Sequence, residues 1–214
     1  ATMPWLRRIE GPGRGVGAAR NAAVAAARAP YLAMVDADDE VAPGWLAAMA
    51  AALDDADLVA GALDVDALNP TWVRGTRGRS IASGPGTFAG VVPFANSCNL
   101  GVRRAVLDAV GGFDESLRAG EDVEFSHRAA RAGFPVAYAP GAVVRYRYRT
   151  DLGALWRQAV AYGRARRDLE SRFRADGLLI PDAPIARAWL GLVKRVPSAV
   201  RRDGRADLVF AADR

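Results

Sequence analysis

Apolar and turn-forming residues alternate along the chain in a way that is typical of an α/β protein. Residues 16–28 are rich in alanine and have high intrinsic helix propensity. Pro30 ends this helix, because the residue before a proline disfavours helical geometry. An apolar strand follows over residues 31–35, then a helix over 43–53 and a buried strand over 58–63. This alternation predicts a layered α/β sheet.

Elements of the same kind follow in the next part of the chain. They are a strand over residues 95–102, a helix over 103–110, a helix from Glu121 that ends at Gly133, and strands over 135–138 and 142–146. Phe125 and Ala129 are expected to point inward from the second of these helices. A short first strand is also predicted over residues 5–9. The 214 residues suffice for one large domain with its own core.

Residues 64–93 break the pattern, because glycine, proline, arginine and serine dominate there. So long an irregular stretch inside a domain is usually a functional loop or a mobile one. We interpret it as a loop over the active site, with simple disorder as the alternative.

The last part of the chain has a helical pattern. Leu152, Leu155, Trp156, Ala159 and Tyr162 recur at spacings of three and four, which predicts one apolar helix stripe. A second amphipathic helix is predicted over residues 185–200. It could lie on an anionic membrane surface, although packing against the domain is the commoner fate of such a helix. We therefore divide the chain into a core over 1–150 and a helical extension, packed on it, over 151–214.

Composition indicates a soluble globular protein, with 51% hydrophobic and 25% charged residues. The net charge of +5 comes almost wholly from arginine, since Lys194 is the only lysine. Arginine and tyrosine alternate over residues 145–149, which could suit stacking on nucleic acid, but recognisable nucleic-acid motifs are missing. We expect no nucleic-acid partner, and expect arginines near the acidic residues to meet phosphate instead.

The single cysteine and the single histidine exclude several kinds of metal and catalytic site. Cys98 is the only cysteine and His127 the only histidine, which excludes an internal disulfide, a multi-cysteine zinc site and a histidine-rich metal centre. We interpret Cys98 as a small core residue and His127 as structural. No apolar run approaches the ~20 residues of a spanning helix, and the start has no signal-peptide character. A cytoplasmic location is expected, with contact to the inner face of the membrane as an open alternative.

Four acids follow the strand over residues 31–35, at positions 36, 38, 39 and 40. Carboxylates crowded at the end of a buried strand repel one another unless a cation neutralises them. Hard oxygen ligands suit Mg²⁺ or Mn²⁺, especially when a substrate phosphate completes the shell. The alternative is a solvated acidic turn that leads into the next helix.

Other charged residues are candidates on weaker grounds. Glu121 and Asp122 open the helix that ends at Gly133, where acids are favoured by the helix dipole alone. Arg20 lies in the first turns of the helix over residues 16–28, where it could bind an anion or be only a solvated charge.

Five short stretches, in this order, resemble the inverting nucleotide-sugar glycosyltransferases of family 2, which have the glycosyltransferase-A fold. They are residues 17–21 (GAARN), 35–39 (VDADD), 99–104 (NLGVRR), 110–115 (VGGFDE) and 120–122 (GED). The resemblance runs from about residue 11 to residue 165. It implies a Rossmann-like mixed sheet flanked by helices.

The resemblance also implies roles for individual residues. Asp36 and Asp38 look like the DxD pair: Asp38 would ligate a divalent metal, Mn²⁺ or Mg²⁺, on the donor diphosphate, and Asp36 would lie near the ribose or a metal-bound water. Arg20 matches a position that reaches the nucleotide. Asp122 looks like the general base that takes the proton of the acceptor hydroxyl. A single displacement inverts the anomeric configuration, so no covalent nucleophile is needed.

Asn99 and Glu121, which lie in two of these motifs, are expected to belong to an acceptor or site loop. Two departures from the family pattern follow. Relatives begin with a strand, a helix and a second strand that hold the nucleotide base, so we expect a core that lacks its first strands. Many relatives also have a histidine after the last strand, where this chain has arginines; Arg145 and Arg147 are expected to bind the diphosphate directly.

We therefore expect metal-dependent transfer of a sugar from a nucleotide-diphosphate donor to a hydroxyl acceptor, which is a glycan, a lipid-linked molecule or a small molecule. A nucleotidyltransferase on a similar sheet is one alternative. A non-catalytic or partner-dependent nucleotide-sugar-binding fragment is the other.

Overall fold

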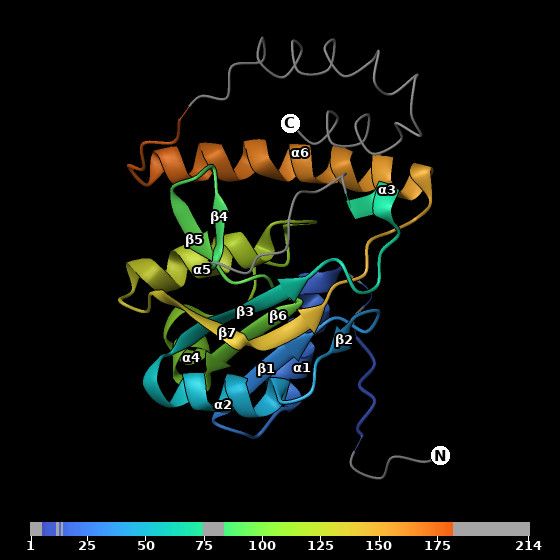
Figure 1. Ribbon diagram of the computed structural model, residues 1–214. Coiled ribbons are helices and arrows are strands. Elements are labelled where there is room, and N and C mark those ends of the chain that lie inside the picture. The colour runs from blue at the N-terminus through green and yellow to red at the C-terminus, as the bar shows by residue number, and fades with distance from the viewer. Residues whose placement is uncertain (1–5, 12, 14, 75–83, 182–214) are drawn as a thin grey trace.

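The computed structural model describes residues 6–11, 13, 15–74 and 84–181 (Figure 1). Its elements are α1 (Val16–Ala26), β1 (Tyr31–Val35), β2 (Glu40–Val41), α2 (Trp45–Asp55), β3 (Leu58–Asp64), α3 (Thr71–Arg74), β4 (Gly86–Phe88), β5 (Val92–Phe94), β6 (Asn99–Arg103), α4 (Arg104–Val110), α5 (Glu121–Arg131), β7 (Val136–Arg145) and α6 (Leu152–Ala175). The helices and strands that were predicted between residues 16 and 175 occur in the predicted order. The prediction missed β2, α3, β4 and β5, and the two strands expected over 135–138 and 142–146 form one strand, β7.

A mixed five-stranded sheet forms the centre, with strand order β1-β6-β3-β7-β2. β6 runs antiparallel to both of its neighbours, whereas β3 and β7 are parallel. The predicted mixed α/β fold is therefore confirmed. Within the described residues β1 pairs on one side only, with β6, so it is less buried than its apolar sequence predicts; Val35 is 41% exposed.

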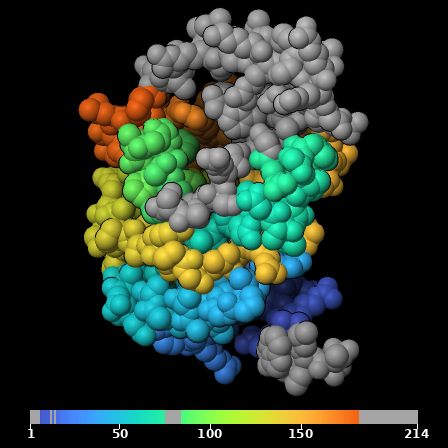
Figure 2. All heavy atoms as spheres, in the orientation of Figure 1, coloured from blue at the N-terminus to red at the C-terminus, as the bar shows by residue number. Residues whose placement is uncertain are grey.

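Helices cover both faces of this sheet. Leu58 and Ala60 of β3 pack with α4 and α5 on one face, while Val59 and Leu63 pack with α2 on the other. Alternate residues of a strand point to opposite faces, so a strand between two helical layers must be apolar throughout. This explains the unbroken apolar run of β3. Figure 2 shows α2 over the lower part of the molecule, below the hairpin and α6.

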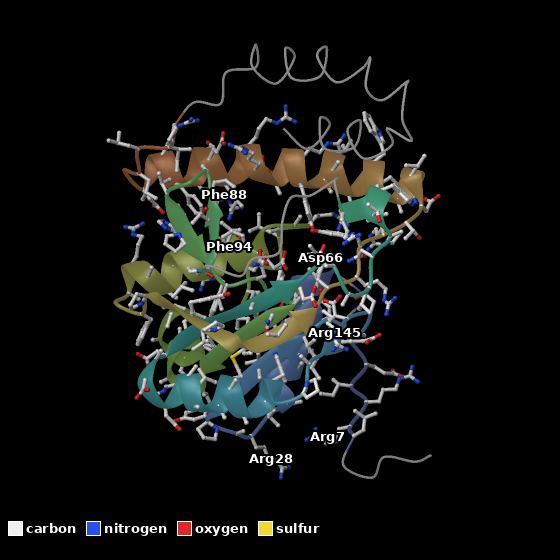
Figure 3. All side chains as sticks on the ribbon, viewed as in Figure 1. Arg7, Arg28, Asp66, Phe88, Phe94 and Arg145 are labelled. Atoms are coloured by element: carbon white, nitrogen blue, oxygen red, sulfur yellow. The ribbon has the colours of Figure 1, made fainter. Side chains whose placement is uncertain are left out.

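A separate apolar cluster joins α6 to α5 and to the hairpin β4–β5. Leu169 and Phe173 of α6 are buried there, and the rings of Phe88 and Phe173 meet edge to face at 5.5 Å. Figure 3 places Phe88 and Phe94 on the hairpin beneath α6. The described part of the extension thus packs on the rest of the chain through a shared core.

Several local predictions need correction. Residues 6–10 form no strand. The stretch over residues 64–93 is not irregular throughout, because it contains α3, β4 and β5, with residues 75–83 outside the described part. On α6, Leu155 and Ala159 are buried as predicted, but Trp156 is 56% exposed, so the stripe faces the core only in part.

The second helix, predicted over residues 185–200, lies outside the described residues. No helix in the described ranges combines the length and apolar character that crossing a membrane would require.

Asn99 proves to be a core residue. Its amide donates to the carbonyl oxygens of Ala62 at 2.7 Å and Ala142 at 2.8 Å, and its own oxygen accepts the indole N–H of Trp45 at 2.8 Å. The prediction that Asn99 belongs to an acceptor-side loop is therefore wrong: it lies in β6 and is fully buried. Its amide joins β3 to β7 beside the point where their pairing shifts, between Gly61 and Ala62.

Candidate active site

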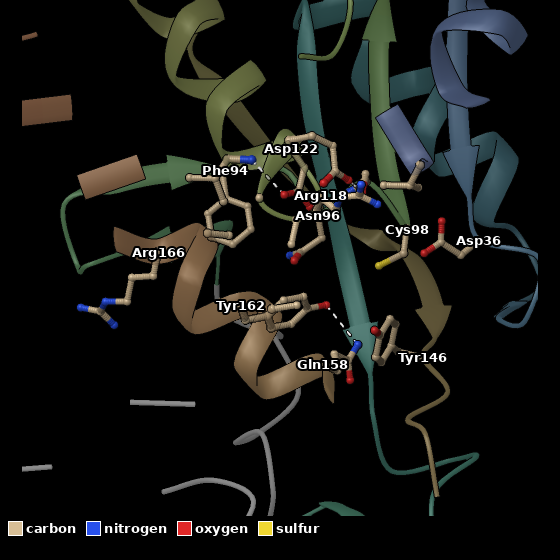
Figure 4. A pocket seen from close by; sticks show the side chains of 18 of the residues that line it. Asp36, Phe94, Asn96, Cys98, Arg118, Asp122, Tyr146, Gln158, Tyr162 and Arg166 are labelled. Atoms are coloured by element: carbon tan, nitrogen blue, oxygen red, sulfur yellow. Dashed lines mark hydrogen bonds between the residues drawn. The ribbon is translucent and has the colours of Figure 1, made fainter. Parts of the chain in front are cut away.

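A cavity of about 920 Å³ lies between the sheet and α6 (Figure 4). The acidic turn after β1 and the residues after β7 bound one end, and the hairpin β4–β5 with α6 bounds the other. The start of α5 lies between them. Gly120 precedes this helix with a φ of 77°, and a Cβ there would lie 2.7 Å from the Leu169 side chain. A glycine thus lets α6 close tightly over the start of α5.

The acidic turn gathers three carboxylates, of Asp36, Asp38 and Asp39, whose nearest oxygens lie within 4.8 Å of one another. Asp39 Oδ1 accepts the backbone N–H of Arg147, whereas its Oδ2 is buried with no hydrogen-bond partner in the described structure. Burial, with the nearby acids, raises the pKa of Asp39 to about 6. A buried, unpartnered oxygen among crowded carboxylates fits a divalent cation. Asp39 is one of the four crowded acids seen in the sequence, but the family resemblance gave a specific role only to Asp36 and Asp38.

The arginines after β7 separate into two groups. Arg147 lines the cavity and donates to the Asp38 carbonyl at 2.9 Å and to the Glu40 carboxylate at 3.0 Å. Arg145 instead lies within β7, paired in register with Glu40 and Asp64, and does not line the cavity (Figure 3). The structure therefore brings Arg147 to the predicted donor end and leaves Arg145 out. Arg149 also lines the cavity.

Arg20 reaches the cavity from α1 and contacts two acids. Its Nη2 lies 2.8 Å from Asp36 Oδ1 and its Nη1 lies 2.5 Å from Glu121 Oε1. The side chains of Arg20 and Glu121 are 11% and 7% exposed, so this is a nearly buried group of charges. Burial and the neighbouring Asp122 raise the pKa of Glu121, and Arg20 opposes the shift.

Asp122 lies beside Glu121 and also lines the cavity. Its Oδ2 accepts the backbone N–H of Ser97 at 3.1 Å and the Ser97 hydroxyl at 3.3 Å, and its Oδ1 accepts the N–H of Val123 at 2.9 Å. Burial raises the pKa of Asp122, while these hydrogen bonds and Arg20 work against the rise. A carboxylate with a raised pKa that faces a cavity can accept a proton from a bound hydroxyl.

Sequence reasoning missed Ser97, because a serine next to an apolar strand carries no local signal of its partner. Cys98, the next residue, is buried as expected and lines the cavity near Asp36 (Figure 4). Burial raises the pKa of its thiol, which disfavours the reactive thiolate. His127 does not line the cavity: its Nε2 lies 3.2 Å from Asp176 Oδ2 and its ring packs on Phe173.

The end of the cavity next to α6 is more apolar. Phe88, Phe94 and Tyr162 contribute rings there, beside Arg118 and Arg166. The Tyr162 hydroxyl accepts a hydrogen bond from the Gln158 amide at 3.2 Å (Figure 4). The guanidinium of Arg166 lies 6.0 Å from the centre of the Phe88 ring. This wall can contact both an apolar surface and polar groups of a ligand.

The mixed sheet, its two helical layers and the acidic turn at the end of β1 define a fold of the glycosyltransferase-A type. The fold matches the mannosyltransferase PcManGT from Pyrobaculum calidifontis, solved in complex with GDP-Man and Mn²⁺, with a TM-score of 0.53 and 16% sequence identity. The match covers 93% of this chain and 66% of that one.

Residues 6–111 match the family model "Glycosyl transferase family 2", and the chain belongs to that family. It is 31% identical over 152 residues to the pre-mycofactocin glycosyltransferase of Mycobacterium tuberculosis, a match that covers 65% of this chain and 31% of the relative. It is also 31% identical over 152 residues to the succinoglycan biosynthesis protein ExoO of Rhizobium meliloti, covering 64% and 43%. The chain thus matches less than half the length of these curated relatives.

Proposed function

We propose that this chain transfers a sugar from a nucleotide-diphosphate donor to a hydroxyl acceptor, with a divalent metal and with inversion at the anomeric carbon. The observation that carries the proposal is one cavity lined by Asp36 and Asp38 as well as by Asp122. Asp39 completes the group of three carboxylates beside it and has a buried oxygen that lacks a hydrogen-bond partner in the described structure. Family membership and the fold support the same reaction class.

The donor end would be formed by the acidic turn and the residues after β7. Asp36, Asp38 and Asp39 would hold Mn²⁺ or Mg²⁺, and a metal there would neutralise negative charge on the leaving diphosphate. Arg147 and Arg149 would contact the diphosphate oxygens, because a guanidinium offers several donors to phosphate. The fold neighbour carries GDP-Man and Mn²⁺, which supports a donor of this class.

Asp122 would act as the general base. The acceptor oxygen attacks the anomeric carbon, its proton passes to the Asp122 carboxylate, and the bond between the anomeric carbon and the diphosphate oxygen breaks on the opposite side of the sugar. The two hydrogen bonds from Ser97 hold Asp122 in one orientation. The raised pKa of Asp122 increases its capacity to hold that proton.

The acceptor would enter along the wall built by the hairpin β4–β5 and α6. Phe88, Phe94 and Tyr162 offer ring faces there, while Asn96 and Gln158 offer amide groups. A mixture of rings and amides suits a hydroxyl carried on a partly apolar molecule, whether a small molecule, a lipid-linked one or a glycan.

Calorimetric titration with UDP and GDP, each with and without Mn²⁺, tests the donor end. We expect binding that requires Mn²⁺ and that Asp38→Asn weakens, with Asp55→Asn, an exposed acid of α2 outside the cavity, as the control. Absence of nucleotide binding to the parent chain would contradict the proposal.

A further inference from the structure

Arg20 connects two acids that belong to different parts of the cavity. Asp36 follows β1 in the acidic turn, and Glu121 begins α5, 101 residues away from Arg20 along the chain. One terminal nitrogen of the guanidinium is engaged by each carboxylate, at 2.8 and 2.5 Å. Charge-assisted hydrogen bonds of this kind are strong. Burial removes competing water from the contact with Glu121, whereas the side chain of Asp36 is 39% exposed. Both terminal nitrogens of Arg20 therefore already contact carboxylates of the protein itself.

Glu121 and Asp122, which are neighbours at the start of α5, have different partners. Glu121 is 7% exposed and forms an ion pair with Arg20. Asp122 forms no ion pair in the described part of the chain, and it accepts its hydrogen bonds from Ser97 and Val123. The Arg20 guanidinium occupies an oxygen of Glu121 and favours the charged form of this carboxylate, against the rise in pKa that burial causes. Asp122 is thus left as the acid that can react.

Arg20 is not alone in attaching α1 to the rest of the chain. The neighbouring Asn21 does this with a pair of hydrogen bonds: its amide donates to the Phe113 carbonyl at 2.9 Å and its oxygen accepts the Phe113 N–H at 2.8 Å. A Cβ on Gly112 would lie 2.3 Å from that oxygen, so the turn is shaped to receive Asn21. The Arg20 ion pairs are therefore available for a task other than docking the helix.

We propose that Glu121 and Arg20 are positioning residues for the candidate metal site: Glu121 holds the Arg20 guanidinium, which in turn holds the Asp36 carboxylate in the orientation that a metal requires. This inference rests on the function proposed for the acidic turn. Its distinctive consequence is that neutralising Glu121, which belongs to another element, weakens binding at Asp36.

The test uses Glu121→Gln, Arg20→Lys and the double variant. Arg20→Lys keeps the charge but replaces the planar fork, which places one nitrogen on each acid, by a single nitrogen. Binding of Mn²⁺ alone is measured by electron paramagnetic resonance, and binding of GDP with Mn²⁺ by calorimetry. We expect each single variant to weaken Mn²⁺ binding about tenfold, as is usual when the partner of a ligand is removed, and the double variant to be no weaker than Arg20→Lys.

Glu124→Gln is the matched control, since Glu124 lies in the same first turn of α5 but pairs with Arg128. It should leave Mn²⁺ and GDP binding unchanged. Unaltered Mn²⁺ binding in Glu121→Gln, or losses that add in the double variant, would overturn the inference. Loss of transfer in Glu121→Gln with full Mn²⁺ and GDP binding would also overturn it, because Glu121 would then act on the acceptor.

A crystal structure of Glu121→Gln separates this inference from the proposed function. We expect Arg20 to leave Asp36, and Asp36 to change its side-chain orientation, whether or not the parent chain binds metal. If Arg20 and Asp36 stay in contact as in the parent, the positioning role is overturned. Failure of the parent to bind both Mn²⁺ and nucleotide would instead remove the proposed function, and with it any role of the contact in metal binding.

Discussion

Ser97 donates two hydrogen bonds to one oxygen of Asp122, from its backbone N–H at 3.1 Å and from its hydroxyl at 3.3 Å. The backbone bond can survive substitution at position 97 by any residue that keeps a backbone N–H, whereas the hydroxyl bond can be removed alone. Because a hydrogen bond to a carboxylate favours its charged form, the hydroxyl lowers the pKa of Asp122 against the effect of burial. Removing only the Ser97 hydroxyl should therefore change the pKa of Asp122 without removing the proposed base itself.

Ser97→Ala should lower kcat by about tenfold, the usual effect of losing one hydrogen bond to a charged group. It should also move the acidic limb of the pH–rate profile to higher pH, because the pKa of Asp122 rises further. Asp122→Asn should lower kcat by a factor of about 10²–10⁴ and leave Mn²⁺-dependent nucleotide binding unchanged. Both are measured by transfer rates across pH and by calorimetry. Transfer by Asp122→Asn at the parent rate would exclude Asp122 as the base.

Arg147 and Arg145 form a matched pair, since they are two residues apart and only Arg147 lines the cavity. If Arg147 contacts the diphosphate, Arg147→Gln should weaken Mn²⁺-dependent GDP binding by about tenfold. Arg145→Gln should leave it within about twofold of the parent. Calorimetry on the two variants checks this, with thermal unfolding to confirm that each is folded. Equal losses in both variants would mean that the effect is a general one of positive charge.

Asn99→Ala should destabilise the fold by about 3 kcal/mol, because two buried carbonyl oxygens and the Trp45 indole N–H lose their partner. Urea unfolding measures this difference. Asp108→Ala, at an exposed position of α4, is the control and should change stability by less than about 0.5 kcal/mol. A small effect at Asn99 would show that water or a shifted strand satisfies these groups.

Asp114 joins α6 to the turn before α5. The Ser116 hydroxyl and the Arg172 guanidinium, whose Nη1 lies 2.7 Å from Asp114 Oδ2, lower the pKa of Asp114 to about 2. A carboxyl whose pKa is lower in the folded state stabilises that state above its unfolded pKa of about 3.9, and the contribution disappears as the pH falls towards 2. Because the pair is partly exposed, we expect about 1 kcal/mol.

Arg172→Gln should therefore be less stable than the parent at pH 6, and the difference should shrink between about pH 4 and pH 2. Urea unfolding across this range measures it. Arg167→Gln, at an exposed position on the same helix, is the control and should follow the parent at every pH. A difference between Arg172→Gln and the parent that stays constant down to pH 2 would show that Arg172 acts without Asp114.

The sequence by itself determined the order of the longer helices and of β1, β3, β6 and β7, because each follows from local periodicity and from proline or glycine at its ends. The short elements β2, α3, β4 and β5 were not predicted. The sequence also placed Asp36, Asp38 and Asp122 among the candidates, since each lies in a short motif that can be read without the fold. The carboxylate of Asp39 was counted among the four acids of the same stretch, but the family resemblance gave a specific role only to Asp36 and Asp38.

Only the tertiary structure decided which of these residues meet. Arg20 and Glu121 are far apart in the chain, and their contact depends on how α1 and α5 dock on the same turn. From the sequence, Asn99 was predicted to be a polar residue of the site. In the structure, the pairing between β3 and β7 shifts beside it, and two backbone carbonyl oxygens accept hydrogen bonds from its amide. Local sequence encodes the shape of each element, whereas the partner of a buried polar group is set by long-range packing, and no local pattern reports that packing.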